Sequence, residues 1–318
     1  MQKIYSAVKL PENAVKIIKK QNFELDMHNE LTTPDQHQII KNIKDADALI
    51  TGVNVNVPSD IINMNSDLKI IANIGSGYNN VDIESAKNHN IPVTNTPVHE
   101  SVASTAELAI TSMLALSRRV LSSHEMAVKN EFDGWQVMGY LGGNQVIDKT
   151  LAIIGFGQIG QYIGKLAQVF DMKILYVDFE EKDATINAEK VSLGEALKEA
   201  DYVITQVNYT EESHYLISKK EFEQMKETAY FINTARGGVV DEEALAEALE
   251  NNQIKAAALD VHEAEPHINE KLTKLDNVIL TPHIGNDTYE ARNKMAEVAS
   301  DQAVKALKQE SLDYQVNE

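Results

Sequence analysis

The chain has 318 residues, a formal net charge of −19 and no cysteine. This length suits two domains better than one. The lack of cysteine excludes disulfides, thiolate metal ligands and cysteine nucleophiles. The negative charge argues against a nucleic-acid partner, because DNA binding depends mainly on lysine and arginine side chains that neutralise phosphates. A solvated acidic surface accounts for the charge.

The apolar segments are short throughout the chain. The start, MQKIYSAVKLPENAVKIIKK, lacks the long apolar core of a signal peptide, and no run approaches the length that spans a membrane. We therefore expect a soluble cytoplasmic protein with no membrane partner.

The first part of the chain alternates between short apolar runs and helical patterns. Strands are expected at 3–8, 23–27, 48–51, 68–73 and 92–95. Helices are expected at 11–20, 34–43, 58–64 and 83–89. Such alternation is typical of a parallel sheet covered by helices. The sequence thus predicts a small α/β domain that lacks a glycine-rich phosphate motif.

A long helical pattern follows at 101–129, and its first half is almost wholly small or apolar. This composition predicts a helix that is buried on more than one side. The next segment, 130–149, is rich in glycine but contains Phe132, Trp135 and Tyr140. We expect an irregular segment whose apolar side chains are covered by a partner subunit or by their own chain.

The strongest signal is a glycine motif between two apolar runs. Leu151–Ile154 predicts a buried strand, and Gly155, Gly157 and Gly160 follow it in G-x-G-x-x-G spacing before a helical pattern. The first glycine allows a tight turn, the second lets the backbone approach a pyrophosphate, and the third lets the helix pack against the strand. Amide groups at the helix start then face the anion.

The next apolar run, 173–177, ends at Asp178. A carboxylate at this point accepts hydrogen bonds from the ribose hydroxyls of an adenosine. It would repel the 2′-phosphate of NADP, and residues 179–181 supply no arginine in its place. The sequence therefore predicts NAD as the cofactor. The alternative is a tight glycine turn that binds no ligand.

The alternating pattern continues to the end of the chain. Strands are expected at 202–206, 229–233, 256–261 and 278–281, and helices at 193–199, 219–225 and 242–251. A final helix at 287–308 could return to the first domain. We predict a substrate domain made of 1–98 and 287–318, interrupted by an NAD-binding domain at 99–286.

Three ionisable residues follow predicted strand ends, where open α/β sheets bind ligands: Arg236, Glu265 and His283. Singly, each has a plain explanation as a solvated cation, a surface acid or a histidine bonded to the backbone. Together they suit the reduction of a 2-oxo acid. A histidine can protonate the carbonyl oxygen as hydride attacks the carbon, while a carboxylate orients the imidazole. An arginine can bind the substrate carboxylate bidentately.

Several motifs resemble the D-isomer-specific 2-hydroxyacid dehydrogenase family. They are NIGSGYNNVDIESA, STAELAI, NTARGGVVDEEAL, ALDVHEAEP and TPHIGNDTYEAR, and the similarity covers almost the whole chain. The resemblance implies an α/β protein with two doubly wound parallel-sheet domains, in which a Rossmann cofactor domain is inserted into a flavodoxin-like substrate domain. It also implies a cleft that closes on ligand, and a homodimer that would cover the region around Trp135.

The resemblance also implies residue roles. Arg236 corresponds to the substrate-binding arginine, Glu265 to the acid of the pair and His283 to the proton donor. Ser76 and Gly77 match the backbone that holds the substrate carboxylate. The cofactor-binding positions are Thr105, Gly155, Gly157, Gln158, Ile159, Gly160, Asp178, Thr234, Ala235, Asp260, His283 and Gly285. No metal is expected.

Two features bear on specificity. Gln206 and Asn208 stand where many members carry His and Pro, in a segment that normally passes beside the adenosine. The resemblance therefore does not fix the affinity for the cofactor at this segment. Glu265 argues against formate, because the formate-oxidising branch has glutamine at that position. The loop 73–82 and the TAEL segment are most similar to the glyoxylate and hydroxypyruvate reductase branch, which implies a small 2-oxo acid.

Other interpretations stay open at this point. The chain could be a D-lactate-type or phosphoglycerate-type dehydrogenase of the same family. It could also be an NAD-sensing protein similar to the corepressors of this family, which keep the three ionisable residues but should turn over 2-oxo acids very slowly. An amino-acid dehydrogenase would normally need a lysine near the substrate, and the three motifs contain none.

Overall fold

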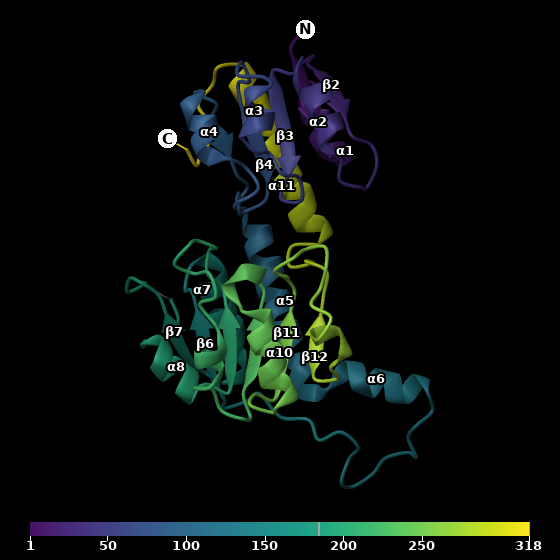
Figure 1. The fold of residues 1–318 in the computed structure, drawn as a ribbon, viewed down its shortest axis with the longest axis vertical. Helices are drawn as coiled ribbons and strands as arrows, with labels where there is room; N and C mark the ends of the chain where they lie inside the picture. The colour runs from purple at the N-terminus through teal and green to yellow at the C-terminus, as the bar shows by residue number, and fades with distance from the viewer. Residues whose placement is uncertain (184, 318) are drawn as a thin grey trace. The chain divides into compact units, whose positions relative to one another are not determined.

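The computed structural model describes residues 1–183 and 185–317. The chain divides into two compact units, one made of Met1–Ser101 with Thr288–Glu318 and the other of Val102–Asp287 (Figure 1). Among the described residues, none of the helices combines the length and the apolar character that a membrane crossing requires.

The first unit contains a five-stranded parallel sheet in the order β2-β1-β3-β4-β5. The strands are β1 (Lys3–Ser6), β2 (Glu24–Met27), β3 (Ala48–Gly52), β4 (Ile71–Ile74) and β5 (Val93–Thr94). This is the order of flavodoxin-like doubly wound sheets. The predicted fold of this unit is therefore confirmed.

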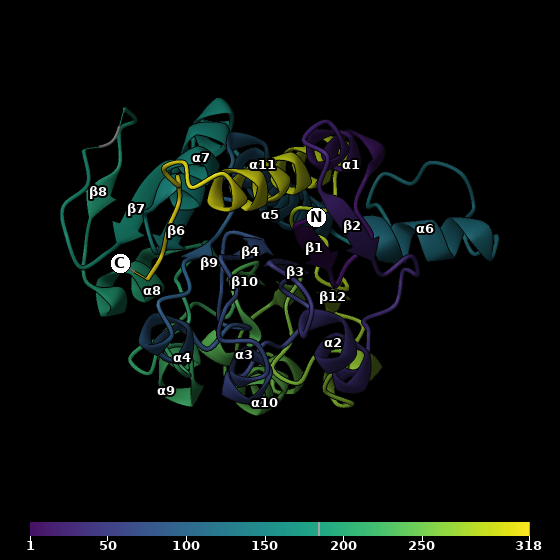
Figure 2. The same ribbon diagram turned by 90° about the horizontal axis from the view of Figure 1, so that it is seen from above.

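Helices cover both faces of this sheet. One face is covered by α2 (Gln36–Ile43), α3 (Ser59–Asn63) and α4 (Ile83–Asn88), and the other by α1 (Glu12–Lys19) and α11 (Tyr289–Leu307). Helix α11 comes from the end of the chain and lies beside α1 (Figure 2). Its buried residues Ala299, Ala303 and Leu307 recur every four positions, which places them on one face of the helix.

The second unit contains a seven-stranded parallel sheet in the order β12-β11-β10-β9-β6-β7-β8. The strands are β6 (Thr150–Ile154), β7 (Lys173–Val177), β8 (Glu189–Lys190), β9 (Tyr202–Thr205), β10 (Tyr230–Asn233), β11 (Ala256–Leu259) and β12 (Val278–Leu280). The chain order reverses between β6 and β9, as in a Rossmann fold. This fold was predicted, but the short edge strand β8 was not, because its two exposed charged residues carry no apolar pattern.

This second sheet is also covered on both faces. Helices α5 (His99–Arg118) and α7 (Gln158–Ala167) pack on one face. Helices α8 (Leu193–Glu199), α9 (Lys219–Phe222) and α10 (Glu242–Glu250) pack on the other. Short 3₁₀ turns lie at Gln168–Phe170, Gly237–Val239 and Leu272–Lys274.

The prediction of one helix over 101–129 is wrong. The helix breaks at Arg119, whose backbone φ of 51° is left-handed, and α6 (Val120–Val128) begins directly after it. A left-handed residue interrupts the right-handed hydrogen-bond path of an α-helix. Helix α6 has no buried residue and extends away from the seven-stranded sheet together with the segment after it (Figure 1). We call residues 120–143 the arm.

Candidate active site

Arg236, Glu265 and His283 lie beyond the carboxyl ends of adjacent strands in the second unit. Arg236 follows β10, Glu265 follows β11 and His283 follows β12. Strands β10, β11 and β12 are neighbours in the sheet, and all are parallel. The topology therefore brings these three predicted residues to the same edge of the sheet, where doubly wound folds bind ligands.

The imidazole of His283 is hydrogen-bonded to Glu265, with 2.9 Å between Nδ1 and carboxylate Oε2. Both side chains are partly accessible, at 33% and 38% of their surface. An ionised carboxylate can only accept hydrogen bonds, so Nδ1 carries the proton of this bond. The other ring nitrogen, Nε2, is then the one that can exchange a proton with a ligand.

Glu265 is held in its ionised form. Burial alone would raise the pKa of its carboxyl, but the hydrogen bonds from His283 and from the backbone N–H of His262 outweigh burial and lower that pKa. The His262 N–H lies 3.0 Å from Glu265 Oε1, so each carboxylate oxygen accepts one of these bonds. The charged carboxylate therefore orients the imidazole of His283 through its bond to Nδ1.

Asp260 fixes the turn that carries His283, which has a left-handed φ of 56°. The backbone N–H of His283 donates to the Asp260 carbonyl oxygen at 2.8 Å. The Asp260 carboxylate accepts bonds from the backbone N–H groups of Ile284 and Gly285, each at 2.8 Å, and from the Thr281 hydroxyl at 2.6 Å. Asp260 was predicted only as a residue near the nicotinamide, and its contacts show that it also shapes the turn.

Arg236 is half-buried, and its Nη1 donates to the carbonyl of Ala235 at 2.6 Å. Burial lowers the pKa of Arg236, and the negative charge of Glu265 acts in the opposite direction. Asn233, which was not among the predicted residues, holds this turn. Its Oδ1 accepts from the Ala235 N–H and from the Thr205 hydroxyl, and its Nδ2 donates to the Arg236 carbonyl. The available signal was one amide at the end of the apolar strand YFIN.

The glycine motif forms a tight turn between β6 and α7. Gly155 has a φ of 94°, and a Cβ there would lie 2.4 Å from the Gln206 carbonyl oxygen. A Cβ at Gly160 would lie 2.3 Å from the Gly155 oxygen. At Gly157, which caps α7, no described atom lies within 4 Å of the Cβ position. Gly155 and Gly160 thus allow close packing of the backbone. Gly157 leaves open space beside the amides in the first turn of α7, including those of Gln158 and Ile159. These residues fit a bound pyrophosphate.

Asp178 lies at the end of β7 and accepts the Phe156 N–H at 2.9 Å. Burial would raise the pKa of Asp178, but the bonds from the backbone N–H groups of Phe156 and Glu180, with the nearby charge of Lys182, lower it. The Lys182 Nζ lies 3.5 Å from Oδ1. Lys182 was not among the predicted residues, and its cation partly offsets the carboxylate that was expected to repel a 2′-phosphate.

Other predicted cofactor positions have close contacts within the second unit. The Gln206 side-chain amide donates to the Thr234 hydroxyl, so the unusual glutamine binds a predicted cofactor residue. A Cβ built at Gly285 would lie 3.2 Å from Asp260 Oδ2 and 3.5 Å from Thr105 Cγ2. Thr105, Asp260 and Gly285 are therefore close neighbours.

Ser76 and Gly77 belong to the first unit, in the loop after β4. The Ser76 carbonyl accepts from Asn95 Nδ2 at 2.7 Å, and the Gly77 carbonyl accepts from Asn73 Nδ2 at 2.9 Å. These bonds fix the loop. Within residues 1–183 and 185–317 there is no cluster of acidic and histidine side chains with the arrangement of a metal site.

Residues 110–285 match the model of the NAD-binding domain of D-isomer-specific 2-hydroxyacid dehydrogenases. The chain is 43% identical to a protein of Staphylococcus aureus strain MRSA252 described as a putative 2-hydroxyacid dehydrogenase, over the full length of both chains.

Solved structures give the same result. The chain resembles the TT0316 protein from Thermus thermophilus with a TM-score of 0.93 and 32% identity, covering 99% of this chain and 100% of the other. It resembles a glyoxylate reductase from Paecilomyes thermophila with a TM-score of 0.89 and 25% identity, covering 99% and 98% of the two chains.

Proposed function

Because the chain belongs to the D-isomer-specific 2-hydroxyacid dehydrogenase family, we propose that it reduces a small 2-oxo acid, glyoxylate or hydroxypyruvate, with NADH. Family membership makes it an NAD(P)-dependent oxidoreductase that acts on 2-hydroxy acids. The observation that supports the proposed chemistry best is the 2.9 Å bond between His283 and Glu265, on the same sheet edge as Arg236.

The proposed mechanism assigns one task to each of these three side chains. The nicotinamide cofactor, when bound, supplies the hydride that the carbonyl carbon of the substrate receives. Arg236 binds the substrate carboxylate bidentately and polarises the carbonyl group. His283 donates a proton from Nε2 to the carbonyl oxygen, so that a 2-oxo acid, a hydride and a proton give a 2-hydroxy acid. Glu265 stabilises the imidazolium before this transfer.

The proposal extends to the binding residues that the family resemblance implies. Ser76 and Gly77 are proposed to bind the substrate carboxylate through their backbone. The proposed cofactor contacts are Thr105, Gly155, Gly157, Gln158, Ile159, Gly160, Asp178, Thr234, Ala235, Asp260, His283 and Gly285. The open space at Gly157 and the clustering of Thr105, Asp260 and Gly285 support this set.

The identity of the substrate is tested by kinetics. We propose glyoxylate or hydroxypyruvate because the loop 73–82 is most similar to that branch, and a glyoxylate reductase is among the structural neighbours. The experiment compares kcat/KM for glyoxylate, hydroxypyruvate, pyruvate and a branched 2-oxo acid. The two small substrates are expected to have the highest values. A preference for pyruvate would favour a D-lactate-type enzyme, and a preference for the branched acid would contradict the proposed substrate class.

The preference for NADH over NADPH is proposed from Asp178, whose lowered pKa keeps it charged at neutral pH. Lys182 acts against this preference because its ammonium lies 3.5 Å from the carboxylate. Asp178→Ser should therefore raise kcat/KM for NADPH. Lys182→Ala should lower kcat/KM for NADPH and so widen its difference from kcat/KM for NADH. A wild-type protein that prefers NADPH would contradict the proposal.

We also propose that the protein is a homodimer that covers the arm. Trp135 is 85% exposed and Met138 is 91% exposed, and α6 has no buried residue and exposes Val120, Leu121 and Val128. Apolar groups that gather on a surface in this way usually mark an interface. The cytoplasmic location remains a prediction.

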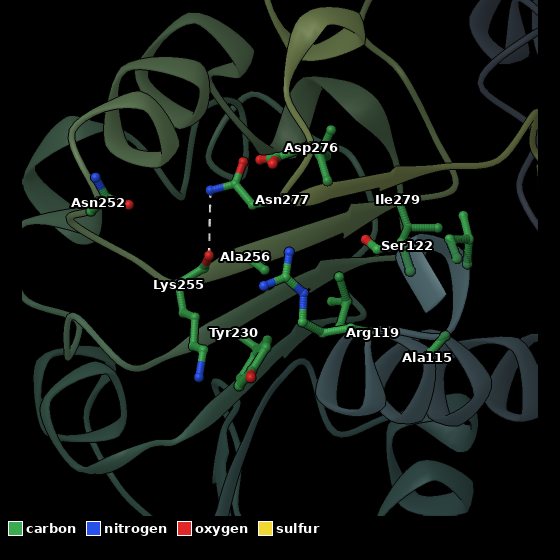
Figure 3. Close-up of a pocket in the computed structure, with 13 residues that line it drawn as sticks. Ala115, Arg119, Ser122, Tyr230, Asn252, Lys255, Ala256, Asp276, Asn277 and Ile279 are labelled. Atoms are coloured by element: carbon green, nitrogen blue, oxygen red, sulfur yellow. Dashed lines mark hydrogen bonds between the residues drawn. The ribbon is translucent and has the colours of Figure 1, made fainter. Parts of the chain in front are cut away.

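A pocket of about 350 Å³ lies at the base of the arm (Figure 3). Tyr230, Ala256 and Val278 line it from the first residues of β10, β11 and β12, so it lies at the edge of the sheet opposite the candidate active site. Leu121, which belongs to the arm, and Arg119, the residue before the arm, also line this pocket. We assign this pocket to the proposed dimer interface, because the exposed arm begins at its rim.

A further inference from the structure

A second carboxylate–imidazole pair, Glu242 and His262, is buried in the second unit beside the proposed proton donor. The two side chains are 5% and 3% exposed, and 3.9 Å separates Glu242 Oε1 from His262 Nδ1. The mechanism proposed above uses neither residue. Burying an acid and an imidazole is costly unless their polar groups find partners, so the pair calls for an explanation.

His262 connects the two strand ends that carry Glu265 and His283. Its ring nitrogen Nε2 lies 3.0 Å from the carbonyl oxygen of Thr281, two residues before His283. Its backbone N–H donates to Glu265 Oε1, also at 3.0 Å. One buried residue therefore contacts the acid of the proposed pair and the turn that bears the imidazole.

Glu242 binds the peptide group that follows His262. It is the first residue of α10, after the cap Asp241, and its Oε1 accepts the Glu263 N–H at 2.8 Å. The peptide between His262 and Glu263 also packs on Gly237, where a Cβ would lie 2.0 Å from the His262 carbonyl carbon. This peptide is thus fixed between α10 and the turn that follows Arg236.

The contacts constrain where the protons lie. The Thr281 carbonyl can only accept, so Nε2 of His262 carries a hydrogen. Nδ1 is buried, has no hydrogen-bond partner among the described residues, and faces the Glu242 carboxylate. Two unprotonated groups would repel each other there, so at least one proton belongs to the pair. Burial raises the pKa of Glu242, which is consistent with a proton held at this place.

The charged groups around the pair come from two elements. Glu242 lies on α10, whereas Glu263 and Glu265 lie on the loop after β11, and both act on Glu242 through their charges. Glu263 is exposed and accepts a hydrogen bond from the Tyr215 hydroxyl. Both charges disfavour the ionised Glu242 carboxylate, which is consistent with a proton held by the pair.

We propose that His262 and Glu242 are positioning residues, which hold the acid and the imidazole of the proposed proton-donating pair at hydrogen-bond distance. His262 ties the Thr281 carbonyl to Glu265, and Glu242 orients the His262 ring and its peptide. This inference rests on the proposed function, because the pair that is positioned is the proposed catalytic one. Neither residue touches the substrate in this account.

The kinetic test compares two variants at one position. His262→Leu removes the donor to Thr281, whereas His262→Gln keeps a side-chain N–H of similar reach. We expect His262→Leu to lower kcat for reduction by about tenfold to a hundredfold, the scale of a small misplacement of a reacting group. The alkaline limb of its pH–rate profile should move to lower pH, with KM for NADH unchanged. His262→Gln should keep kcat and the position of the alkaline limb close to their wild-type values.

The control is His267→Leu, an exposed histidine in the same loop, which should behave as wild type. A purely structural role of His262 would lower the melting temperature and leave the pH limb in place. Equal effects of His262→Leu and His262→Gln, or a wild-type kcat in His262→Leu, would overturn the inference.

A spectroscopic test does not depend on turnover. Nitrogen-15 NMR of histidine-labelled protein should show a hydrogen on Nε2 of His262, and Glu242→Gln should shift the Nδ1 resonance of this ring. A His262 ring protonated only on Nδ1 would overturn the inference. If His283→Ala stays active, the proposed proton donor is wrong, and the NMR result still decides whether His262 is tied to Thr281.

Discussion

The strand-end loops of the second unit and the arm differ in the contacts that their side chains make within the chain. In the loops, Asp260, Glu265 and His283 all bond to groups of their own chain, and these bonds fix the proposed catalytic geometry. In the arm, Trp135 and Met138 are almost fully exposed. The first region is preorganised by the fold, whereas the second is expected to find its contacts on another copy.

This contrast has a physical basis. The loops follow buried parallel strands, and their polar atoms lie close enough to one another to replace water as hydrogen-bond partners. The arm begins directly after Arg119, where a left-handed backbone turns the chain away from its own core. Preorganisation lowers the cost of reaching a transition state, and exposed apolar surface favours association.

The largest effect is expected from His283→Ala. The reduction step loses its proton donor, and kcat should fall by about a hundredfold to ten-thousandfold. Binding of NADH, measured by calorimetry, should stay close to the wild-type value because the glycine turn is unchanged. His267→Ala, in an exposed histidine of a nearby loop, is the matched control. A variant that retains most of its kcat would show that another group supplies the proton.

Arg236→Lys should have the next largest effect. Lysine keeps the positive charge but cannot form the planar bidentate bond to a carboxylate. We expect kcat/KM for glyoxylate to fall by about tenfold to a hundredfold, mainly through KM, because one charged hydrogen bond is weakened. Arg118→Lys, on the exposed side of α5, serves as the control. An unchanged KM would remove Arg236 from substrate binding.

The arm is tested by Trp135→Ser. If a second copy covers this side chain, its loss should raise the dissociation constant of the dimer by about thirtyfold, the scale of a central aromatic residue in an interface. Sedimentation at several concentrations measures this constant. Leu31→Ser, at a residue that is 93% exposed and outside the arm, should have no effect. A wild-type protein that sediments as a monomer at high concentration would contradict the proposed dimer.

Much of the candidate site could be predicted from the sequence, because strand-end positions follow from the alternating pattern. Arg236, Glu265 and His283 each lie in the loop that follows an apolar strand, and parallel strands bring such loops to one edge of the sheet. Asp178 and the glycine turn were found because their spacing has a geometric cause. These features are local in sequence, so a pattern can reveal them.

The remaining features depend on contacts that are distant in sequence. Lys182 affects the candidate cofactor site because its ammonium lies beside the carboxylate of Asp178. Asn233 affects the candidate active site because its side-chain amide bonds across the turn to the Arg236 carbonyl. His262 looks like one more residue after a strand until its ring is placed between Thr281 and Glu242. The left-handed backbone at Arg119 has no signature in residue type, since arginine rarely adopts it. No periodicity encodes these arrangements.

The pH–rate profile of Glu265→Gln tests the central claim most directly. The lowered pKa of Glu265 keeps its carboxylate charged at neutral pH, 2.9 Å from the imidazole of His283. The proposed mechanism needs an imidazolium at His283, which a neighbouring negative charge stabilises, so activity should be lost as pH rises through the alkaline limb. Replacing the charge with an amide should move that limb of kcat/KM to lower pH by about one unit. A limb that stays at the wild-type pH, with kcat preserved, would contradict the account.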